Sequence, residues 1–243
     1  VIEIGVLAEF IIYVNMLTWP VAVVGWITSI VQQAEASQKR INEFLKEDPE
    51  IESGKGIRKK IIGDLEFKNV SLNYPETGIK ALRNINLIIP SGTTLGIIGN
   101  IGSGKTTLLD TILRLYDPTE GKIILDGHDL KEFKLDELRN TIGYVPQNSF
   151  LFSESIEDNI RFGNPKASNK AIQKNAKKAV VHNNIIKFKD GYKTLLGERG
   201  VTLSGGQIQR ISIARALIKY PQILLLDDCL SAVDTDTEDE ILK

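Results

Sequence analysis

The stretch GNIGSGKT at residues 99–106 constrains the fold more than any other part of the sequence. It follows the apolar run TTLGIIG (93–99) and precedes KTTLLDTILRLY (105–116), whose apolar residues recur at helical spacing. The pattern G-x-x-x-x-G-K-[ST] between a strand and a helix is typical of a loop that holds phosphate with backbone N–H groups. Lys105 would then meet phosphate oxygens, and the Thr106 hydroxyl would ligate Mg²⁺. The sequence therefore predicts a P-loop inside an α/β domain.

A second constraint is ILLLDDCLSAVD at residues 223–234, an apolar strand that ends in two adjacent aspartates. Two carboxylates side by side repel each other, so a positive charge is expected next to them. In P-loop proteins such a strand lies beside the phosphate loop, and its aspartate holds the magnesium. Magnesium prefers hard oxygen ligands and keeps several waters, so one carboxylate is enough. Asp227 is therefore predicted to be the magnesium ligand, with Lys105 close by.

The remaining elements alternate between strand-like and helix-like patterns. The predicted strands, bounded by glycine and proline turns, are LEFKNVSLNY (65–74), ALRNINLII (81–89), GKIILDG (121–127), TIGYVPQ (141–147) and QILLLDD (222–228). The polar, lysine-rich stretch 155–188 is more helical in pattern, with Ser168 as a candidate N-cap, and GGQIQRISIARALIKY (205–220) is a predicted helix. This alternation favours an α/β domain with a largely parallel sheet.

The N-terminal segment VLAEFIIYVNMLTWPVAVVGWITSIV (6–31) is mostly apolar, and Glu9 is its one charged residue. As a helix it would reach about 39 Å, long enough to cross a bilayer with some tilt. A buried core helix is the alternative, but a polar amphipathic stretch follows, and Pro20 is tolerable in a membrane helix. We expect a membrane span whose cytoplasmic end is marked by Lys39 and Arg40.

Composition restricts the partners. The net charge of −1 gives no global attraction to nucleic acid, and the lysines of 155–188 lack interleaved aromatics, so they form a solvated helix face. The single cysteine, Cys229, excludes an intrachain disulfide and is interpreted as a small buried apolar residue. His128 and His182 have no companion at metal-ligand spacing. No nucleic-acid partner is predicted.

LSGGQ at residues 203–207 separates the P-loop families. Two glycines flanked by Ser204 and Gln207 ahead of a helix make a second backbone cradle for an anion, although the same residues could form a plain turn with Ser204 as N-cap. A chain with two cradles suits a composite site, in which each copy presents LSGGQ to a nucleotide held by its partner.

With these motifs the chain resembles the ABC transporter family over nearly its whole length. The resemblance implies an α/β P-loop NTPase domain with a mostly parallel sheet, a helical subdomain and an antiparallel β portion, using ATP and Mg²⁺. Tyr74 matches the aromatic that stacks on adenine, Gln147 the Q-loop glutamine, and SAVD (231–234) the D-loop. The residues assigned to ATP binding are Tyr74, Gly99, Asn100, Ile101, Gly102, Ser103, Gly104, Lys105, Thr106, Thr107, Ser204, Gly205, Gly206 and Gln207. The residues assigned to magnesium are Thr106, Gln147 and Asp227, and those assigned to catalysis are Asp228, Gln147 and Lys105.

The N-terminal helix and TLLGERG (194–200) resemble the exporter branch, in which helix and ATPase share one chain. The expected domains are a last transmembrane helix with its extension (1–45), a linker (46–62) and a C-terminally truncated ATP-binding domain (63–243). This implies half of an exporter, an ATPase coupled to transport. It would be multi-pass in the cell membrane at full length, with the ATP-binding domain cytoplasmic. A second half-transporter, identical or different, would complete the ATP sites, and the exported substrate is open. A soluble ABC ATPase and a regulatory, weakly hydrolysing half of a heterodimer are the alternatives.

Asp228 departs from the family, which usually has glutamate where the attacking water is polarised. Aspartate is one methylene shorter, so its carboxylate falls short by about 1.5 Å, and a misplacement near 1 Å costs on the order of 100-fold in rate. We therefore expect intact ATP binding and slow hydrolysis at this copy's own site. The family's switch histidine lies beyond the D-loop, so the chain is expected to be a piece of a longer protein.

Overall fold

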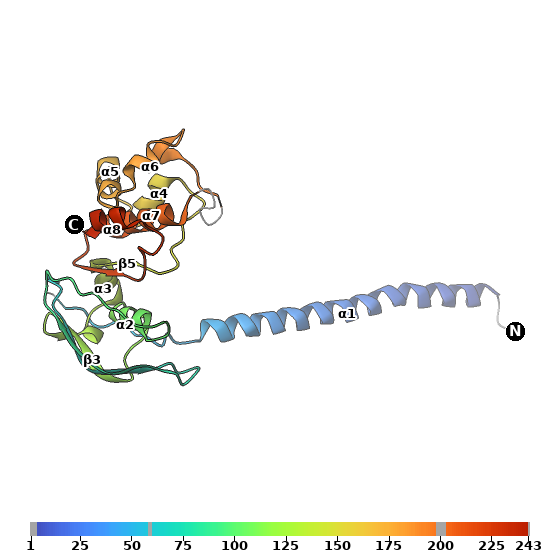
Figure 1. The fold of residues 1–243 in the computed structure, drawn as a ribbon. Coiled ribbons are helices and arrows are strands. Elements are labelled where there is room, and N and C mark those ends of the chain that lie inside the picture. The colour runs from blue at the N-terminus through green and yellow to red at the C-terminus, as the bar shows by residue number, and fades with distance from the viewer. Residues whose placement is uncertain (1–3, 58–59, 198–202, 243) are drawn as a thin grey trace. The chain divides into compact units, whose positions relative to one another are not determined.

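The computed structural model describes residues 4–57, 60–197 and 203–242, and it divides into two compact units on either side of Glu50 and Ile51. Figure 1 follows the chain from the N-terminal helix into the second unit. The predicted boundaries at 45 and 62 lie on either side of this division.

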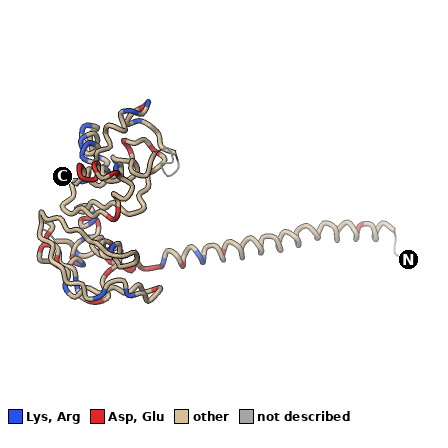
Figure 2. The backbone as a smooth tube through the Cα atoms, viewed as in Figure 1, with Lys and Arg blue, Asp and Glu red and all other residues tan. Residues whose placement is uncertain are grey.

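The first unit is one helix, α1 (Ile4–Leu45), which contains Pro20 and has no buried residue. Its 42 residues correspond to about 63 Å. Figure 2 shows a long uncharged stretch along its middle, and large apolar side chains such as Trp19 and Trp26 are exposed there. Within the described residues, α1 is the single helix long and apolar enough to cross a membrane.

The larger sheet of the second unit is antiparallel, with strand order β2-β1-β3-β4. Its strands are β1 (Leu65–Asn73), β2 (Lys80–Ile89), β3 (Glu120–Leu125) and β4 (His128–Asp129). Asp126 and Gly127, both at positive φ (52° and 86°), form the two-residue turn between β3 and β4. Asp-Gly is favoured where both turn residues need left-handed backbone, so the sequence itself sets this hairpin.

The smaller sheet pairs β5 (Ile142–Val145) with β6 (Ile223–Leu226) in parallel. The described residues therefore contain the expected parallel strands and the expected antiparallel portion, and the antiparallel sheet is the larger of the two. The predicted strand at 93–99 is not formed. This described segment makes no ladder of hydrogen bonds with another strand, and Ile98 is fully exposed. Gly96 and Gly99 give it few side chains to pack, and glycine weakens a strand.

Helices pack against the sheets and against one another, and some of them build a second core. They are α2 (Lys105–Ile112), α3 (Leu135–Thr141), α4 (Ile156–Arg161), α5 (Asn169–Lys178), α6 (His182–Ile185), α7 (Gly205–Leu217) and α8 (Thr235–Leu242), with 3-10 turns at Leu130–Glu132 and Gly191–Lys193. One core joins the antiparallel sheet, α2 and α3, and the other joins α4, α5, α6 and α7. The second core corresponds to the expected helical subdomain. Ser168 caps α5 as predicted, since its hydroxyl accepts a hydrogen bond from the Ala171 N–H.

The connecting residues 52–56, here called the strap, are held on the second unit. The backbone N–H groups of Gly54 and Gly56 donate to the carbonyls of Phe133 (3.1 Å) and Glu132 (3.0 Å). Ser53 Oγ accepts from the N–H of Leu135 at 3.1 Å, at the start of α3. A Cβ on Gly54 would lie 2.4 Å from backbone atoms of the 131–132 segment, so a glycine is needed for this close approach.

The strap is also tied to the end of α2. Arg114, only 3 % exposed, donates to the Glu52 carbonyl at 3.1 Å and forms an ion pair with Asp117. Burial acts to raise the pKa of Asp117, but the hydrogen bonds and charge of Arg114 outweigh it and lower that pKa. Arg114 adopts left-handed backbone (φ 49°), which explains why α2 ends at Ile112, short of the predicted residue 116.

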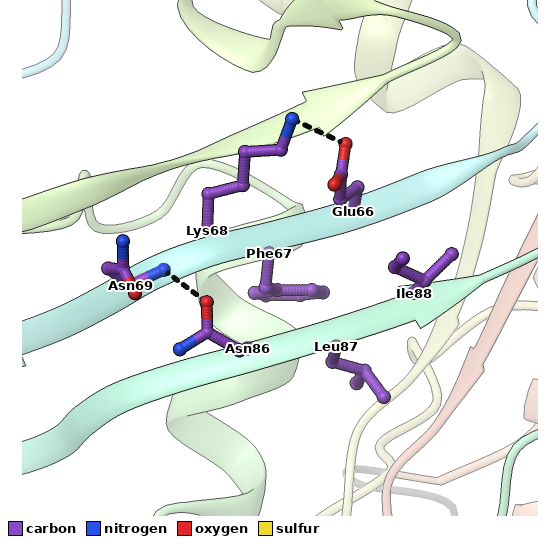
Figure 3. A pocket seen from close by; sticks show the side chains of 7 residues that line it. All are labelled: Glu66, Phe67, Lys68, Asn69, Asn86, Leu87 and Ile88. Carbon is purple, nitrogen blue, oxygen red and sulfur yellow. Dashed lines mark hydrogen bonds and ion pairs between the residues drawn. The ribbon is translucent and has the colours of Figure 1, made fainter.

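A shallow groove crosses the first two strands of the antiparallel sheet, as Figure 3 shows. It is lined by residues 66–69 of β1 and 86–88 of β2. Lys68 pairs with Glu66 at 3.0 Å, and Asn86 accepts from the Asn69 N–H. None of the predicted site residues lines this groove.

Candidate nucleotide site

Glycines shape the loop that enters α2. Gly102 and Gly104 lie at φ 77° and 92°, where residues with a Cβ are strained. A Cβ on Gly104 would also lie 2.5 Å from the Ala81 carbonyl oxygen of β2. Gly104 is the N-cap of α2 and provides no side-chain hydrogen bond to the first turn. Helix N-termini without such a cap offer their N–H groups to an anion, so the loop has the geometry that phosphate requires.

Lys105 is folded back over this loop. Its Nζ donates to the carbonyl oxygens of Gly99 (2.8 Å) and Asn100 (3.0 Å). The ammonium group is therefore placed at the loop, next to the start of α2. A Cβ on Gly99 would come within 2.7 Å of Ser103 Oγ, which keeps the loop narrow at its base.

A hydrogen bond between distant parts of the sequence joins Thr106 to Asp227. Thr106 Oγ1 donates to Asp227 Oδ2 at 2.8 Å across 121 positions of sequence. Asp227 is 5 % exposed, and its N–H donates to the Val145 carbonyl, which extends the β5–β6 pairing. A hydroxyl and a buried carboxylate at this distance are the hard oxygen donors that suit Mg²⁺, which needs few protein ligands. The residues present therefore fit the predicted magnesium site.

Asp110 and Tyr144 also belong to this site, although neither was among the site residues predicted from the sequence. Burial, followed by the charge of Asp227, raises the pKa of Asp110. Burial, then Asp110 and Asp227, raises the pKa of Tyr144 to about 12. Asp110 lies four residues after Thr106, hence on the same face of α2, and this spacing was the signal that could have revealed it. Asp110 and Asp227 therefore concentrate negative charge at this site, and a divalent cation bound there would neutralise it.

Gln147 and Asp228, both assigned to catalysis from the sequence, lie together. Gln147 Nε2 donates to Asp228 Oδ2 at 3.1 Å, with both side chains exposed. Asp228 has left-handed backbone (φ 46°), which aspartate tolerates better than most residues. The turn after β6 therefore directs this carboxylate toward the glutamine that follows β5.

Tyr74 lies beside the loop but is half-buried. Its hydroxyl is 2.9 Å from Thr107 Oγ1, and its ring meets Tyr116 edge to face at 5.0 Å between centroids. Tyr74 packs against the first core as well. The side chain of Tyr74 is thus held next to Thr107, the second residue after Lys105.

Ser204, Gly205, Gly206 and Gln207 form the first turn of α7. Ser204 Oγ accepts from the Gln207 N–H, and Gln207 Oε1 accepts from the Ser204 N–H, a reciprocal capping box. None of the hydrogen bonds of the described residues joins this turn to residues 99–107. The neighbouring residue is Ala232, whose carbonyl oxygen would lie 2.6 Å from a Cβ on Gly206. In one copy of the chain, the two cradles are separate.

The predicted exporter loop 194–200 is described in part. Thr194 to Gly197 are described, and Leu195 pairs with Ser155 in an isolated bridge while its side chain is 72 % exposed. Glu198, Arg199 and Gly200 lie outside the described residues. Cys229 is buried as expected, and burial raises its thiol pKa to about 11.

Residues 82–231 match the family profile described as ABC transporter. The multidrug resistance-like ATP-binding protein MdlA of Buchnera aphidicola subsp. Schizaphis graminum is 46 % identical over all of this chain and 42 % of its own length. The probable multidrug resistance ABC transporter ATP-binding/permease protein YheI of Bacillus subtilis is 41 % identical, again over all of this chain and 42 % of its own. The chain thus spans about two fifths of the length of these curated relatives.

A solved structure, that of a bacterial Atm1-family ABC exporter with ATP bound, superposes with a TM-score of 0.87 at 33 % identity. It covers 95 % of this chain and 41 % of the exporter chain. The profile match includes the P-loop, the Q-loop glutamine, the LSGGQ turn and both aspartates. The chain therefore belongs to the ABC transporter family.

Proposed function

We propose that this chain is the ATP-binding domain and last membrane helix of one half of an ABC exporter, which couples ATP binding and hydrolysis to export. The observation that carries the proposal is the 2.8 Å hydrogen bond between Thr106 and Asp227, because it brings the two magnesium-binding motifs to one point. The relatives' names, with multidrug resistance and an ATP-bound exporter among them, support the same function. Small organic compounds are accordingly the first substrate class to test.

The ATP site is built by the chain's own groups. The N–H groups of residues 99–105 and the Lys105 ammonium would hold the phosphates, and Thr106 and Asp227, with Gln147, would hold Mg²⁺. When bound, Mg²⁺ neutralises phosphate charge. Asp228 orients the water for hydrolysis through its carboxylate, which Gln147 holds by a hydrogen bond. Tyr74 lies at the edge of the loop, where it would stack on the base.

The separation of the two cradles supports a paired arrangement. Because Ser204–Gln207 lie apart from the P-loop in one chain, they suit the nucleotide of a second half-transporter, which completes each ATP site. Closing the pair on ATP and reopening it after hydrolysis would move the membrane helices between two states.

The exposed apolar surface of α1 supports a membrane location over a soluble ABC ATPase. We place α1 across the bilayer as the last of several spans, with Lys39 and Arg40 and the ATP-binding domain on the cytoplasmic side. Asp228 makes hydrolysis at this copy's own site slow. A homodimer of slow sites and a heterodimer with one faster site both agree with this geometry, and the turnover of each assembly distinguishes them.

The test is ATP binding by the full-length transporter in detergent, measured by isothermal titration with and without Mg²⁺. We expect micromolar to submillimolar affinity that requires Mg²⁺, and at least about a tenfold loss in Lys105→Ala, since the phosphate charge loses its ammonium partner. Lys170→Ala, an exposed residue of α5, should bind like the parent protein. Equal affinity in the parent and Lys105→Ala proteins would refute the assignment.

A further inference from the structure

Gln209 is a buried polar residue of α7 that neither the motif analysis nor the proposed ATP site uses. It is 8 % exposed, and both ends of its side-chain amide are bonded to the residues after Asp228. Its Oε1 accepts from the Ala232 N–H at 3.2 Å, and its Nε2 donates to Ser231 Oγ at 3.3 Å. A buried amide with both ends paired fixes the segment that it contacts.

The direction of these hydrogen bonds follows from the donors available. The Ala232 backbone N–H can only donate, so the oxygen of the Gln209 amide must face it, and the NH₂ group then faces Ser231. Ser231 accepts from that NH₂, and its own proton goes to the Asp228 carbonyl oxygen at 3.1 Å. A chain of hydrogen bonds therefore runs from α7 through Ser231 to the backbone of Asp228.

Asp228 is thereby held at two places. The relay from Gln209 reaches its carbonyl, and Gln147 holds its carboxylate at 3.1 Å. These hydrogen bonds also hold the left-handed backbone of Asp228 (φ 46°), a conformation that aspartate tolerates better than most residues but that still costs more than for glycine. The orientation of the carboxylate thus depends on the 228–232 turn.

The same turn packs against the signature residues. A Cβ on Gly206 would lie 2.6 Å from the Ala232 carbonyl oxygen, and one on Gly205 would lie 3.5 Å from the Ala232 side chain. The first turn of α7 and the 228–232 turn therefore touch directly, and Gln209 joins them by hydrogen bonds three residues further along the helix. The two turns are one connected piece of structure.

We propose that Gln209 is a positioning residue that holds Asp228 in the orientation needed for hydrolysis. The inference rests on the proposed function, in which Asp228 acts at this copy's own site and Ser204–Gln207 act at the partner's. Through the Gln209 relay, the backbone of Asp228 is fixed to α7, so that its carboxylate keeps one direction. The relay belongs to this chain alone and requires no contact with nucleotide.

The test uses the full-length transporter and two measurements. Gln209→Met keeps the size of the side chain and removes both hydrogen bonds. Without ATP, we expect amide hydrogen exchange in the 228–232 turn to rise about tenfold, with exchange in the rest of α7 unchanged. In the ATPase assay, we expect kcat to fall about tenfold and the KM for ATP to stay within about twofold, because a misdirected carboxylate slows chemistry without weakening binding.

Matched variants complete the design. Gln173→Met, at an exposed position of α5, should match the parent in both measurements. Gln209→Glu keeps the acceptor for Ala232 and loses the donor to Ser231, so its kcat should fall between those of the parent and Gln209→Met. If Gln209→Met does not fold, Ser231→Ala, which cuts the relay at its middle, is measured in its place.

Each outcome decides the proposal. Parent-like exchange in the turn, or parent-like kcat, in the relay variants would overturn it, and so would a loss of kcat matched by an equal loss of ATP affinity. Failure of the proposed function is distinguishable, because the parent protein would then show no Mg²⁺-dependent ATP binding while the exchange measurement still reports on the relay.

Discussion

At the scale of single residues, the rate of ATP hydrolysis that we expect of this chain depends on Asp228. Its carboxylate is exposed, bonded to Gln147, and shorter than the glutamate that the family usually has at this position. Its left-handed backbone is a conformation that aspartate adopts more readily than glutamate. Lengthening the side chain therefore improves reach at a small cost in backbone strain.

We expect Asp228→Glu to raise the kcat for ATP of the assembled transporter by roughly 10- to 100-fold, because the carboxylate moves about 1.5 Å closer to the attacking water. Steady-state ATPase assays measure this. Asp239→Glu, at an exposed position of α8, is the matched control and should leave kcat unchanged. No increase in Asp228→Glu would show that the length of the side chain does not limit turnover.

Cys229 gives a prediction about pH. Burial raises the folded-state pKa of this thiol to about 11 from its ordinary value near 9.0, so the folded protein keeps the thiol neutral. The contribution of the buried neutral thiol to the stability of the folded protein is fully present below pH 9. It is lost as the pH rises from 9 toward 11, because the thiol of the unfolded protein ionises first. At pH 8 a maleimide should label Cys229 only after unfolding, which mass spectrometry can follow. Rapid labelling of the native protein would contradict burial.

At the scale of elements, turn and cap residues were predictable because they act locally. The Asp126-Gly127 turn, the Ser168 cap and the Ser204 cap all follow from residue type. The contact between Thr106 and Asp227 was also predictable, since motif spacing identifies both partners.

Other elements depend on contacts that no local pattern encodes. The apolar run 93–99 has strand composition, but a strand also needs a paired neighbour, and among the residues that the structure describes the parallel sheet consists of β5 and β6. The length of α2 depends on Arg114, whose side chain is buried by Asp117 and the distant Glu52 carbonyl. The bridge from Gln209 to the 228–232 turn has the same long-range origin.

The strap yields the prediction at this scale. Gly54→Ala would place a Cβ 2.4 Å from the backbone of residues 131–132, so the strap must shift and lose its hydrogen bonds to Phe133 and Glu132. Overpacking of this kind costs about 1–3 kcal/mol. Chemical denaturation of the full-length protein and limited proteolysis at the strap would measure the loss.

Gly96→Ala is the matched control, because nothing lies within 4 Å of a Cβ at that position and its φ is not positive. It should unfold at the same denaturant concentration as the parent. Equal stability of Gly54→Ala and Gly96→Ala would show that residues 52–56 are not packed on the 131–132 segment.

At the scale of the whole molecule, the contrast between an unburied apolar helix and a packed ATPase unit supports a membrane protein. We expect Val24→Cys to resist an aqueous maleimide in native membranes, since Val24 lies in the apolar part of α1. Asn42→Cys, near the charged end, should react from the cytoplasmic side. The buried Cys229 gives little background. Equal labelling of both introduced cysteines would exclude a bilayer location for this helix.

The hydrogen bonds that hold the strap on the second unit limit how far the two units can move independently of each other. Residues 52–56 are bonded to the ATPase unit, so only six residues, 46–51, remain between that unit and the end of α1. Fully extended, six residues span at most about 20 Å, and Pro49 reduces the number of conformations available to them. A displacement of the second unit by more than this extended length must also move α1. The covalent connection is therefore short, and under the proposed function it would transmit larger displacements of the second unit to α1.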